Sequence, residues 1–579
     1  MRSPLPAPAL TTFNPGQQTS WWADLVLLGL IVGLAAFIGY GLEQMNQPLG
    51  VLDASPLSLD LARLPEYALR TTLRMFIALF ASFVFSLVIA TLAAKSRKAA
   101  MVILPALDIL QSVPVLGFLT FTVVFFMGLF PGKESGVECA AIFAIFTSQV
   151  WNMTFSVYQS LRTVPNDLYD VSRQFGFSPW QRFIRLELPF ATPGLVWNMM
   201  MSMSGGWFFV VACEAITVGD TTVSLPGIGS WLALAIEQKN VAATVWAVLA
   251  MVTIILLYDL LFFRPVVAWV DRFRFEQTAA QKRPRSRIYD LLRSTRLVPL
   301  MLTALGDIKA ALYMHRLPRL PQLRFKVSEG FSRVADRAWI ALVALACLAG
   351  LLQLAGFIAS TLGLEDVIGA FGLGLVTLLR VAVLIVLASL VWVPIGVWIG
   401  LHPRWAERLQ PVAQLLAAFP ANVLFPFAVI AIVTLKLDPN IWLSPLMVLG
   451  TQWYILFNVI AGASALPNDL REAARNFRIG GWQWWRVVAL PGIFPYYVTG
   501  ALTAAGGSWN ASIVAEAVSW GDEHLYASGL GAFIAQATTA GDLPRVALGV
   551  TVMSVFVVGF NRLLWRPLYG FAERRLRID

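Results

Sequence analysis

The chain of 579 residues is 58% hydrophobic and only 13% charged, with a mean hydropathy of +0.70. Soluble globular domains carry roughly 25% charged residues, so this composition excludes that class. The net charge of +10 does not indicate nucleic-acid binding, because residues 264–337 hold 16 Lys/Arg and 6 Asp/Glu and account for all of it. A basic segment beside membrane spans is first of all a topology signal, and it favours a cytoplasmic position.

Many apolar runs of about 20 residues are long enough to cross the hydrocarbon core of a bilayer as helices. We therefore predict an all-α polytopic membrane protein with about twelve spans. The expected spans are 21–42, 70–94, 105–130, 137–160, 194–217, 241–263, 338–362, 375–400, 411–435, 441–461, 496–518 and 545–565. Six spans in each half make the halves parallel, related by an axis along the membrane normal.

The distribution of Lys and Arg predicts the orientation. Loops 95–98, 161–193, 402–408 and 463–495 and the tail 574–577 carry Lys/Arg and fall on one side in this arrangement, whereas the opposite loops are poor in both. The positive-inside rule places these loops, and both termini, in the cytoplasm.

The remaining composition points to neither a signal peptide nor a metal. Residues before Trp21 lack the signal-peptide order of charges, short apolar core and cleavage site, so we expect 21–42 to be a retained first span. The three cysteines lie singly in apolar segments, which supports neither a disulfide framework nor a metal site.

A polar island occurs twice between apolar segments, as residues 165–189 and 467–491. Sliding the sequence by 302 positions aligns them without a gap, with 18 identities in the 56 positions of 165–220. The chain is a duplicated membrane unit, and the island is the polar part retained in both copies.

The first island predicts a short helix, a turn and a second helix that leads into the membrane. Asn166 is expected to cap the first helix, and Gly176 fits the position just past its end. Ser178-Pro179-Trp180-Gln181 then has the pattern of a capping box with proline at the first helical position.

The islands also carry a spacing of E-A-A, three residues, G, nine residues and I-x-L-P. The second copy has Glu472-Ala473-Ala474 and ends Val488-Ala489-Leu490-Pro491, and the first has Asp170-Val171-Ser172, Gly176 and Leu186-Glu187-Leu188-Pro189. This pattern resembles the cytoplasmic signature of permease subunits of ABC importers. The first copy departs from it by lacking E-A-A, and the second has Arg478 where glycine is expected.

The resemblance implies that each island is a coupling helix, which docks in a groove of a separate ATPase subunit. Two ABC ATPase subunits on the cytoplasmic side and an extracytoplasmic substrate-binding protein are the implied partners. The implied ATPase-coupling residues are Asn166, Asp167, Asp170, Arg173, Gly176, Asn468, Asp469, Glu472, Ala473, Ala474 and Arg475.

We expect five parts, of which the resemblance covers the two permease domains. They are an N-terminal tail with the first span and an extracytoplasmic loop (1–64), permease domain 1 (65–275), a basic cytoplasmic linker (276–337), an additional span (338–369) and permease domain 2 (370–579). The linker is either a tether with an inside-positive bias or a segment that lies on the anionic inner leaflet.

The sequence contains no ATP site of its own. Its one Gly-Lys pair, Gly132-Lys133, is followed by Glu134 and lacks the G-x-x-x-x-G-K-[ST] spacing that cradles phosphates. We therefore expect no catalytic residue, no bound cofactor and no enzyme activity in this chain, with ATP used by partner subunits.

Charged residues inside spans are costly and mark candidate functional sites. Arg74 and Arg380 align at an offset of 306, and Glu214 and Glu516 align at 302. The arginines either snorkel to the interface, attract anions or pair with an acid. The glutamates either pair with those arginines, form gate contacts or meet a delivering protein.

Small residues and tryptophan recur together in equivalent spans. Close helix packing is one interpretation, and a translocation path at the pseudo-twofold axis with tryptophan as a gate is the other. The candidate residues are Gly205, Trp207, Gly507, Trp509 and Asn510.

The stretch GGSWNASIVAE resembles the nitrate/sulfonate/taurine branch of these permeases, as do Pro226-Gly227-Ile228-Gly229 and Ser528-Gly529-Leu530-Gly531. That branch implies import of a small oxyanion or organic anion. The alternatives are a duplicated permease of the ferric-iron or thiamine type and a secondary transporter with parallel six-span repeats.

Overall fold

A computed structural model describes most of the chain. The described residues are 21–44, 57–111, 113–218, 221–270, 273, 287–295, 329–402, 405, 408–409, 412–413, 416–417, 419–464, 466 and 468–575. The N-terminal tail and most of the expected linker 276–337 lie outside them.

The chain divides into two compact units. Unit 1 comprises Met1–Gln44, Phe155–Met200 and Leu256–Ala335, and unit 2 comprises Met45–Thr154, Met201–Ile255 and Asp336–Asp579. The units do not follow the sequence halves, because unit 2 takes large parts of both.

Unit 1 is helical in its described part. Its elements are α1 (Trp21–Gln44), α7 (Asn166–Gln174), α8 (Pro179–Arg182), the π-helical η2 (Phe183–Glu187), the π-helical η3 (Asp259–Phe263), α12 (Arg264–Val270) and α13 (Arg287–Arg293). Three helices run from one unit into the other: α6 (Glu134–Arg162), α9 (Leu188–Glu214) and α11 (Val241–Tyr258).

Unit 2 holds the remaining helices. From the first sequence half it takes η1 (Leu61–Arg63), α3 (Leu64–Lys95), α4 (Arg97–Leu110), α5 (Val115–Leu129) and α10 (Ile228–Glu237). From the second it takes α16 (Leu364–Leu401), η5 (Ala421–Leu424), α18 (Phe425–Thr434), α19 (Pro439–Trp442), α20 (Leu446–Leu449), α21 (Gln452–Ser464), α22 (Asn468–Asn476), α23 (Gly481–Trp484), η6 (Trp485–Ala489), α24 (Leu490–Ala515), α25 (Leu530–Thr539), α26 (Leu543–Phe560), η7 (Asn561–Trp565) and α27 (Arg566–Arg575). Most of α15 (Glu329–Ala359) also belongs to unit 2.

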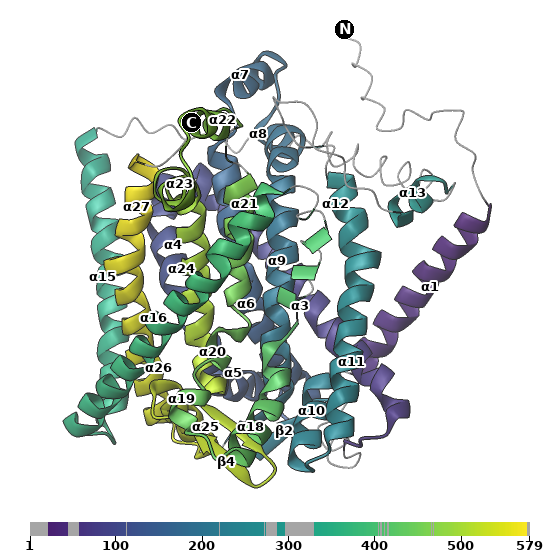
Figure 1. The fold of residues 1–579 in the computed structure, drawn as a ribbon, viewed down its shortest axis with the longest axis vertical. Helices are drawn as coiled ribbons and strands as arrows, with labels where there is room; N and C mark the ends of the chain where they lie inside the picture. The colour runs from purple at the N-terminus through teal and green to yellow at the C-terminus, as the bar shows by residue number, and fades with distance from the viewer. Residues whose placement is uncertain are drawn as a thin grey trace. The chain divides into compact units, whose positions relative to one another are not determined.

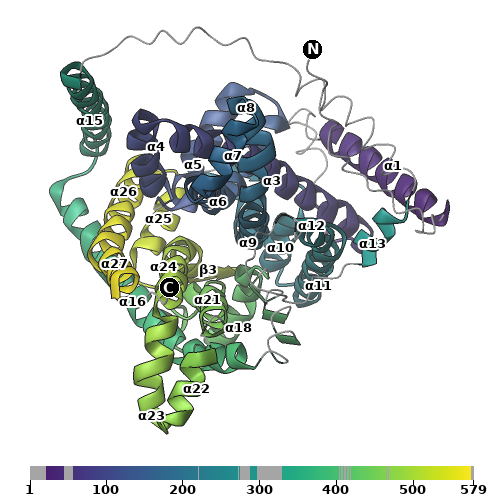
Figure 2. The same ribbon diagram turned by 90° about the horizontal axis from the view of Figure 1, so that it is seen from above.

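Helix α24 is the centre of unit 2. It contacts α16, α20, α21, α25 and α27, and α16, α21, α25 and α27 lie around it when unit 2 is seen from above (Figure 2). Helix α5, from the first sequence half, contacts α24, α25 and α26. One hydrophobic core therefore contains residues of both halves, such as Val115 and Val123 on α5 beside Trp509 and Met553.

Eight helical segments of the described residues are long and apolar enough to cross a membrane, or nine if one bent pair counts as a span. All eight coincide with expected spans, and the bent pair, Pro439–Leu449 with Gln452–Ser464, coincides with 441–461. The all-α polytopic class is confirmed, but twelve uninterrupted spans are not.

The expected spans 105–130 and 411–435 are wrong as continuous helices. The first is divided between α4 and α5, and in the second the helical run starts again at η5. Pro114 and Pro420 stand before α5 and η5 with extended backbone, at ψ 118° and 110°. Proline lacks an N–H and disfavours helix in the residue before it, which explains a break at equivalent places in the two halves.

Within the described residues, four π-helical segments occur at matched positions: η2, η3, η6 and η7. Each ends two residues before a proline, at Pro189, Pro265, Pro491 or Pro567. A proline ring crowds the carbonyl one turn earlier, and a widened turn relieves that contact. The duplicated prolines thus explain the duplicated π segments.

Two β-hairpins interrupt the helical fold, and the sequence reading did not predict them. Strands β1 (Ala215–Val218) and β2 (Thr221–Ser224) pair antiparallel, with Ala215 opposite Ser224. Strands β3 (Ala517–Trp520) and β4 (Glu523–Tyr526) pair likewise, with Ala517 opposite Tyr526. Within unit 2, α22 and α23 lie at one end of the long helices, and α25 and β4 lie at the other (Figure 1).

Candidate functional site

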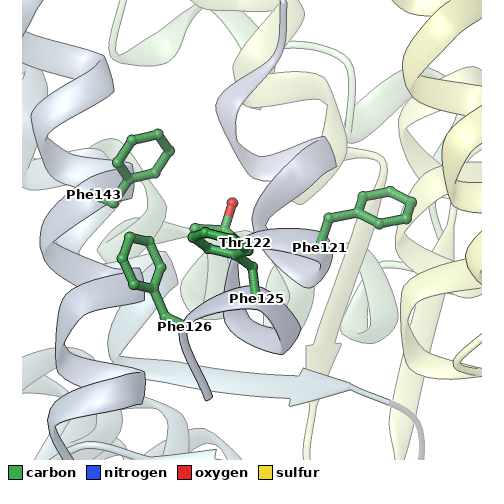
Figure 3. A pocket seen from close by; sticks show the side chains of 5 residues that line it. All are labelled: Phe121, Thr122, Phe125, Phe126 and Phe143. Atoms are coloured by element: carbon green, nitrogen blue, oxygen red, sulfur yellow. The ribbon is translucent and has the colours of Figure 1, made fainter. Parts of the chain in front are cut away.

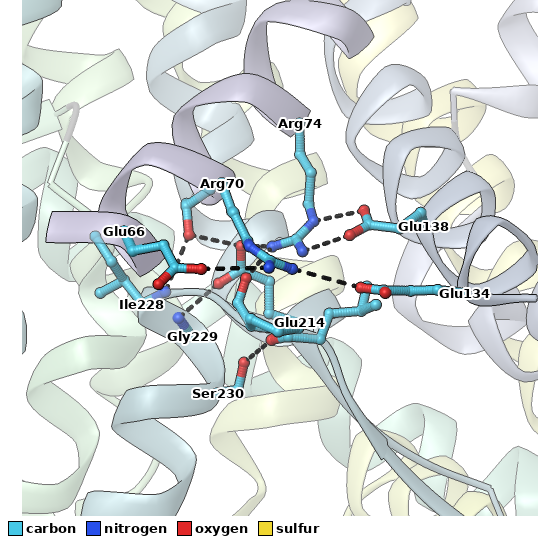
Figure 4. Close-up of polar contacts among 12 residues, drawn as sticks. Glu66, Arg70, Arg74, Glu134, Glu138, Glu214, Ile228, Gly229 and Ser230 are labelled. Atoms are coloured by element: carbon cyan, nitrogen blue, oxygen red, sulfur yellow. Dashed lines mark hydrogen bonds and ion pairs between the residues drawn. The ribbon is translucent and has the colours of Figure 1, made fainter. Parts of the chain in front are cut away.

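The carboxylate at the end of α9 is the polar centre of the first half (Figure 4). Glu214 is fully buried, and its Oε1 accepts hydrogen bonds from Arg74 Nη1 and Thr71 Oγ1, both at 2.7 Å. Its Oε2 accepts the backbone N–H of Gly229 at 2.6 Å. Its backbone carbonyl accepts the N–H of Leu225, where the chain returns from the β1–β2 hairpin.

This carboxylate caps the start of α10. Gly229 is the second residue of that helix, and the N–H of Ile228, the first, donates to Thr71 Oγ1 at 3.0 Å. A helix N-terminus has unpaired N–H groups and favours a negative charge, so Glu214 satisfies both needs. A Cβ on Gly227 would overlap the Glu214 carboxylate, and one on Gly229 would approach the Val211 carbonyl at 2.6 Å. The close approach therefore requires glycine at both positions.

The second half repeats the arrangement. Glu516 Oε1 accepts Thr377 Oγ1 and Arg380 Nη1, both at 3.0 Å, and its Oε2 accepts the N–H of Gly531 at 2.7 Å. The N–H of Leu530 donates to Thr377 Oγ1 at 2.9 Å. A Cβ on Gly529 would again overlap the carboxylate.

The two centres differ in the second hydrogen-bond partner of the arginine. Arg74 makes a bidentate pair with Glu138, in which Nε and Nη2 each donate at 2.6 Å. Arg380 has Asn440 instead, with Nη2 at 3.4 Å from Oδ1. Glu138 and Asn440 align at the same offset of 302, so an acid in one half stands where the other has an amide.

Arg74 and Arg380 thus pair with acids inside the protein. Snorkelling of Arg74 does not occur, because its side chain is only 1% exposed. The sequence reading missed the threonines and Glu138, although Thr71 and Thr377 share the offset of 306 with the arginines and precede each by three residues.

The glycine and tryptophan candidates are packed inside unit 2. Trp207 and Trp509 are 0% and 1% exposed. A Cβ on Gly205 would lie 3.3 Å from the hydroxyl of Tyr454, and one on Gly507 would lie 2.6 Å from Cγ2 of Thr451. Close packing accounts for these residues in this conformation, and a role in the translocation path stays a prediction.

Asn510 joins the two sequence halves. Its Oδ1 accepts the N–H of Val115 at 2.8 Å and so caps the start of α5. In the reverse direction, Asn422 Nδ2 donates to the Phe208 carbonyl at 3.1 Å. The two contacts lie one position apart in the aligned halves, because 208 aligns with 510 and 115 aligns with 421, the residue before Asn422. They hold the halves together where Pro114 and Pro420 break the helices.

A second pair of cross-half contacts lies at the hairpins. The N–H of Gly521 donates to the Ile236 carbonyl at 2.9 Å, and Lys239 Nζ donates to Asp522 Oδ2 at 3.0 Å. Lys239 holds the pKa of the exposed Asp522 carboxyl below its usual range, by its hydrogen bond first and its charge second. An exposed pair of this kind stabilises little by itself.

The first island forms the predicted helix, turn and second helix in unit 1. Both contacts of the capping box between Ser178 and Gln181 are present. The expected cap at Asn166 is wrong: Pro165 occupies the capping position, and Asn166 is the first helical residue, followed by Asp167 in the first turn. Asp170 and Arg173 form an exposed ion pair at 3.3 Å.

Tyr169 holds α7 to the segment that follows. Its hydroxyl lies 3.5 Å from Glu187 Oε1, and the guanidinium carbon of Arg182 lies 5.8 Å from its ring centre. Burial, and then the charge of Glu187, raise the pKa of the Tyr169 phenol. The second copy has Arg471 and Ala489 at these positions, so this anchor belongs to the first copy.

The second island, in unit 2, has the same local fold. Helix α22 contains Asp469, Glu472, Ala473, Ala474 and Arg475, and it begins at Asn468. The backbone of Gly176 has φ +67°, and that of Arg478 has φ +53°. Both helices are therefore followed by a residue in the left-handed conformation. Arg478 forms the same turn as Gly176, but with backbone strain that glycine does not have.

Large apolar side chains are exposed on these polar loops. Phe175 and Phe477, at matched positions, are 65% and 79% exposed, and Trp482 is 74% exposed. These exposed side chains make the two loops candidate interaction surfaces.

An aromatic cavity of about 240 Å³ lies between α5 and α6 (Figure 3). Phe121, Thr122, Phe125, Phe126 and Phe143 line it. None of these side chains is charged, so the cavity offers no ionic partner to an anion. Among the described residues, no group of His, Cys, Asp or Glu has the arrangement of a metal site.

Two segments of the chain match one protein family, described as the binding-protein-dependent transport system inner membrane component. The matches cover residues 82–274 and 392–577, more than half of the chain. The chain belongs to this family. It is a transmembrane permease subunit of an ABC importer, with the permease domain present twice.

Relatives of the permease include transport proteins with named substrates. It is 28% identical to the nitrate import permease protein NrtB of Leptolyngbya laminosa over 203 residues, 35% of this chain and 67% of the relative. It is 30% identical to the bicarbonate transport system permease protein CmpB of Synechococcus elongatus over 154 residues, 26% of this chain and 54% of the relative. It is 33% identical to the glycine betaine/proline betaine permease protein ProW of Escherichia coli over 137 residues, 24% of this chain and 36% of the relative.

The glycines beside the carboxylates give a direct test of the capped helix starts. Gly227→Ala should lower the free energy of unfolding by about 3 kcal/mol, because the new methyl displaces Glu214 from its buried partners. Gly506→Ala is the matched control, since a Cβ there meets nothing within 4 Å. Thermal unfolding of the purified permease measures both, and equal midpoints for the two variants would contradict the assignment.

Gly176 and Arg478 have left-handed backbone, and we expect substitutions at these two positions to affect amide exchange differently. Gly176→Ala should destabilise α7 by about 1 kcal/mol, because a side chain is disfavoured at φ +67°, and should speed amide exchange of Asn166–Gln174 roughly fivefold. Arg478→Gly should not speed exchange in α22, because it removes that strain. Unchanged exchange in the Gly176 variant would refute this interpretation.

Proposed function

We propose that this permease forms the translocation path for a small anion, which a substrate-binding protein delivers and two ATPase subunits drive across the membrane. The ATPase subunits dock on α7 and α22. The observation that carries the proposal is the duplicated loop helix with an exposed phenylalanine at the same position, Phe175 and Phe477. Catalysis of ATP hydrolysis belongs to the partners, and this chain binds no cofactor.

The surface of each loop helix fits a protein partner. Helix α7 combines Val171 and Phe175, which are 46% and 65% exposed, with the charged pair Asp170 and Arg173. Aromatic anchors within a polar rim are typical of binding sites that exclude water at their centre. The departures between the copies, Tyr169 against Arg471 and Gly176 against Arg478, give the two docking contacts different strengths.

The arrangement of the second half supports an assignment of sides. Helix α22 and the β3–β4 hairpin lie at opposite ends of the unit 2 helices (Figure 1). Helix α22 lies in the Arg-rich loop 463–495, so the positive-inside rule favours a cytoplasmic position for this end of unit 2. We propose that both termini are cytoplasmic as well. The hairpins and α25 then face the binding protein in an integral inner-membrane protein.

The proposed substrate class is argued from the names of the relatives and from the ion pairs of the two buried arginines. NrtB and CmpB carry the names of nitrate and bicarbonate, both small planar oxyanions. Arg74 is engaged by Glu138 and Glu214, and Arg380 by Glu516, so neither offers an unshared charge to an anion. Selection of the anion therefore belongs chiefly to the binding protein.

Charge reversal on the loop helices tests the docking. Glu472→Arg should leave the permease folded, because the side chain is exposed, but should reduce co-purification of the ATPase at least tenfold if the groove is basic there. Asp170→Arg should act in the same direction, with a smaller effect because its side chain is shorter. Co-purification and substrate uptake are measured in the same cells.

Glu365→Arg is the matched control, since it reverses an exposed acid in the first turn of α16. Membrane abundance of all variants is measured alongside. An intact complex and normal uptake in the Asp170/Glu472 double variant would remove these carboxylates from the coupling role and favour a secondary transporter.

A further inference from the structure

The first half contains more buried acids than its buried arginines can balance (Figure 4). Side chains of Arg70 and Arg74 on α3 are 10% and 1% exposed, and those of Glu134, Glu138 and Glu214 are 2%, 2% and 0% exposed. We call these five residues the acid cluster. Fully ionised, it would carry three negative and two positive charges in a desolvated site.

Arg74 is saturated by two of the acids. Its Nε and Nη2 bind Glu138, and its Nη1 binds Glu214 and the carbonyl of Pro226. Bidentate guanidinium–carboxylate pairs of this kind keep both partners ionised. Glu134 therefore depends on Arg70 for compensation.

Arg70 is shared between two carboxylates. Its Nη2 lies 3.3 Å from Oε1 of Glu66, which is 36% exposed and so keeps water contact. Its Nη1 lies 3.6 Å from Glu134 Oε1, beyond hydrogen-bond distance, and that oxygen has no hydrogen-bond partner although it is buried. An ionised carboxylate in this position lacks the bonds that normally offset desolvation.

We propose that the acid cluster holds a bound proton, carried by the carboxyl group of Glu134. Its position in the first turn of α6 favours the ionised form, and so does the charge of Arg70. Arg70 is shared with Glu66, and no hydrogen bond to Glu134 Oε1 offsets its desolvation, so the protonated form is favoured. A cation is a poorer occupant, because the described carboxylates do not converge as a metal site does.

The second half supports this assignment by its different composition. Lys436 aligns with Glu134 and Asn440 with Glu138, while Val376 aligns with Arg70. One arginine, Arg380, then faces one buried acid, Glu516, at 3.0 Å. That centre is neutral without a proton, so proton binding is a property of the first half alone.

The proton makes the stability of the first half depend on pH. Arg70 and Arg74 from α3 and Glu138 from α6 itself act on the charge of Glu134. Glu66 pairs with Arg70, Glu214 from α9 pairs with Arg74, Cys139 follows Glu138, and exposed Lys133 precedes Glu134. Unfolded glutamates titrate near pH ~4.3, so at neutral pH the folded chain retains a proton that the unfolded chain releases. Stability therefore falls as pH rises through the range in which Glu134 ionises.

Infrared difference spectroscopy of the full chain in lipid nanodiscs tests the proposal. We expect a protonated-carboxyl band at neutral pH that shifts in D₂O, disappears at high pH and is missing in Glu134→Gln. The amide closely matches the protonated acid in shape, so this variant should fold. Glu66→Gln is the control, and it should keep the band.

Thermal unfolding between about pH 6 and pH 9 supplies a second readout. The midpoint of the wild-type chain should fall with rising pH, and that of Glu134→Gln should fall by several degrees less. Absence of the band in the wild type, its persistence in Glu134→Gln, or identical pH slopes for the two proteins would each overturn the proposal.

Discussion

A buried carboxylate at the end of one helix, shared with the start of the next, organises each half of this permease. Glu214 and Glu516 each accept hydrogen bonds from an arginine, a threonine hydroxyl and the N–H of the second residue of a short helix. Three helices therefore meet at one point in each half. They are α3, α9 and α10 in the first half and α16, α24 and α25 in the second. Because the groups are desolvated, loss of one partner leaves an uncompensated charge.

Duplication preserved the geometry of these centres while their compositions diverged. The second half keeps a simple pair, Arg380 with Glu516, whereas the first adds Glu138 to its arginine and Glu134 beside it. The loop helices diverged in the same manner, since Arg478 adopts the left-handed backbone that Gly176 adopts without strain. Two halves with one architecture thus have different electrostatics and different docking surfaces.

Periodicity and duplication predicted the membrane class, most spans and the helix–turn–helix islands, because long apolar runs and capping residues act locally. They did not predict the hairpins, whose strands are four residues long, or the helix breaks, although Pro114 and Pro420 were visible at aligned positions. Alignment of Arg74 with Arg380 identified half of each centre. Thr71 and Glu138 join it through contacts across 64 to 157 residues of chain, and Gly229 joins it through a contact across 15 residues. Local patterns do not encode these contacts.

A double-mutant cycle on Arg380 and Glu516 tests the central claim most directly, because that centre has no second acid. The free energy of unfolding is measured for the wild type, Arg380→Met, Glu516→Gln and the double variant. The account predicts that each single change costs about 3 kcal/mol and that the double variant loses at least ~1 kcal/mol less than their sum. Additivity within ~0.5 kcal/mol would contradict the claim that this pair organises the half.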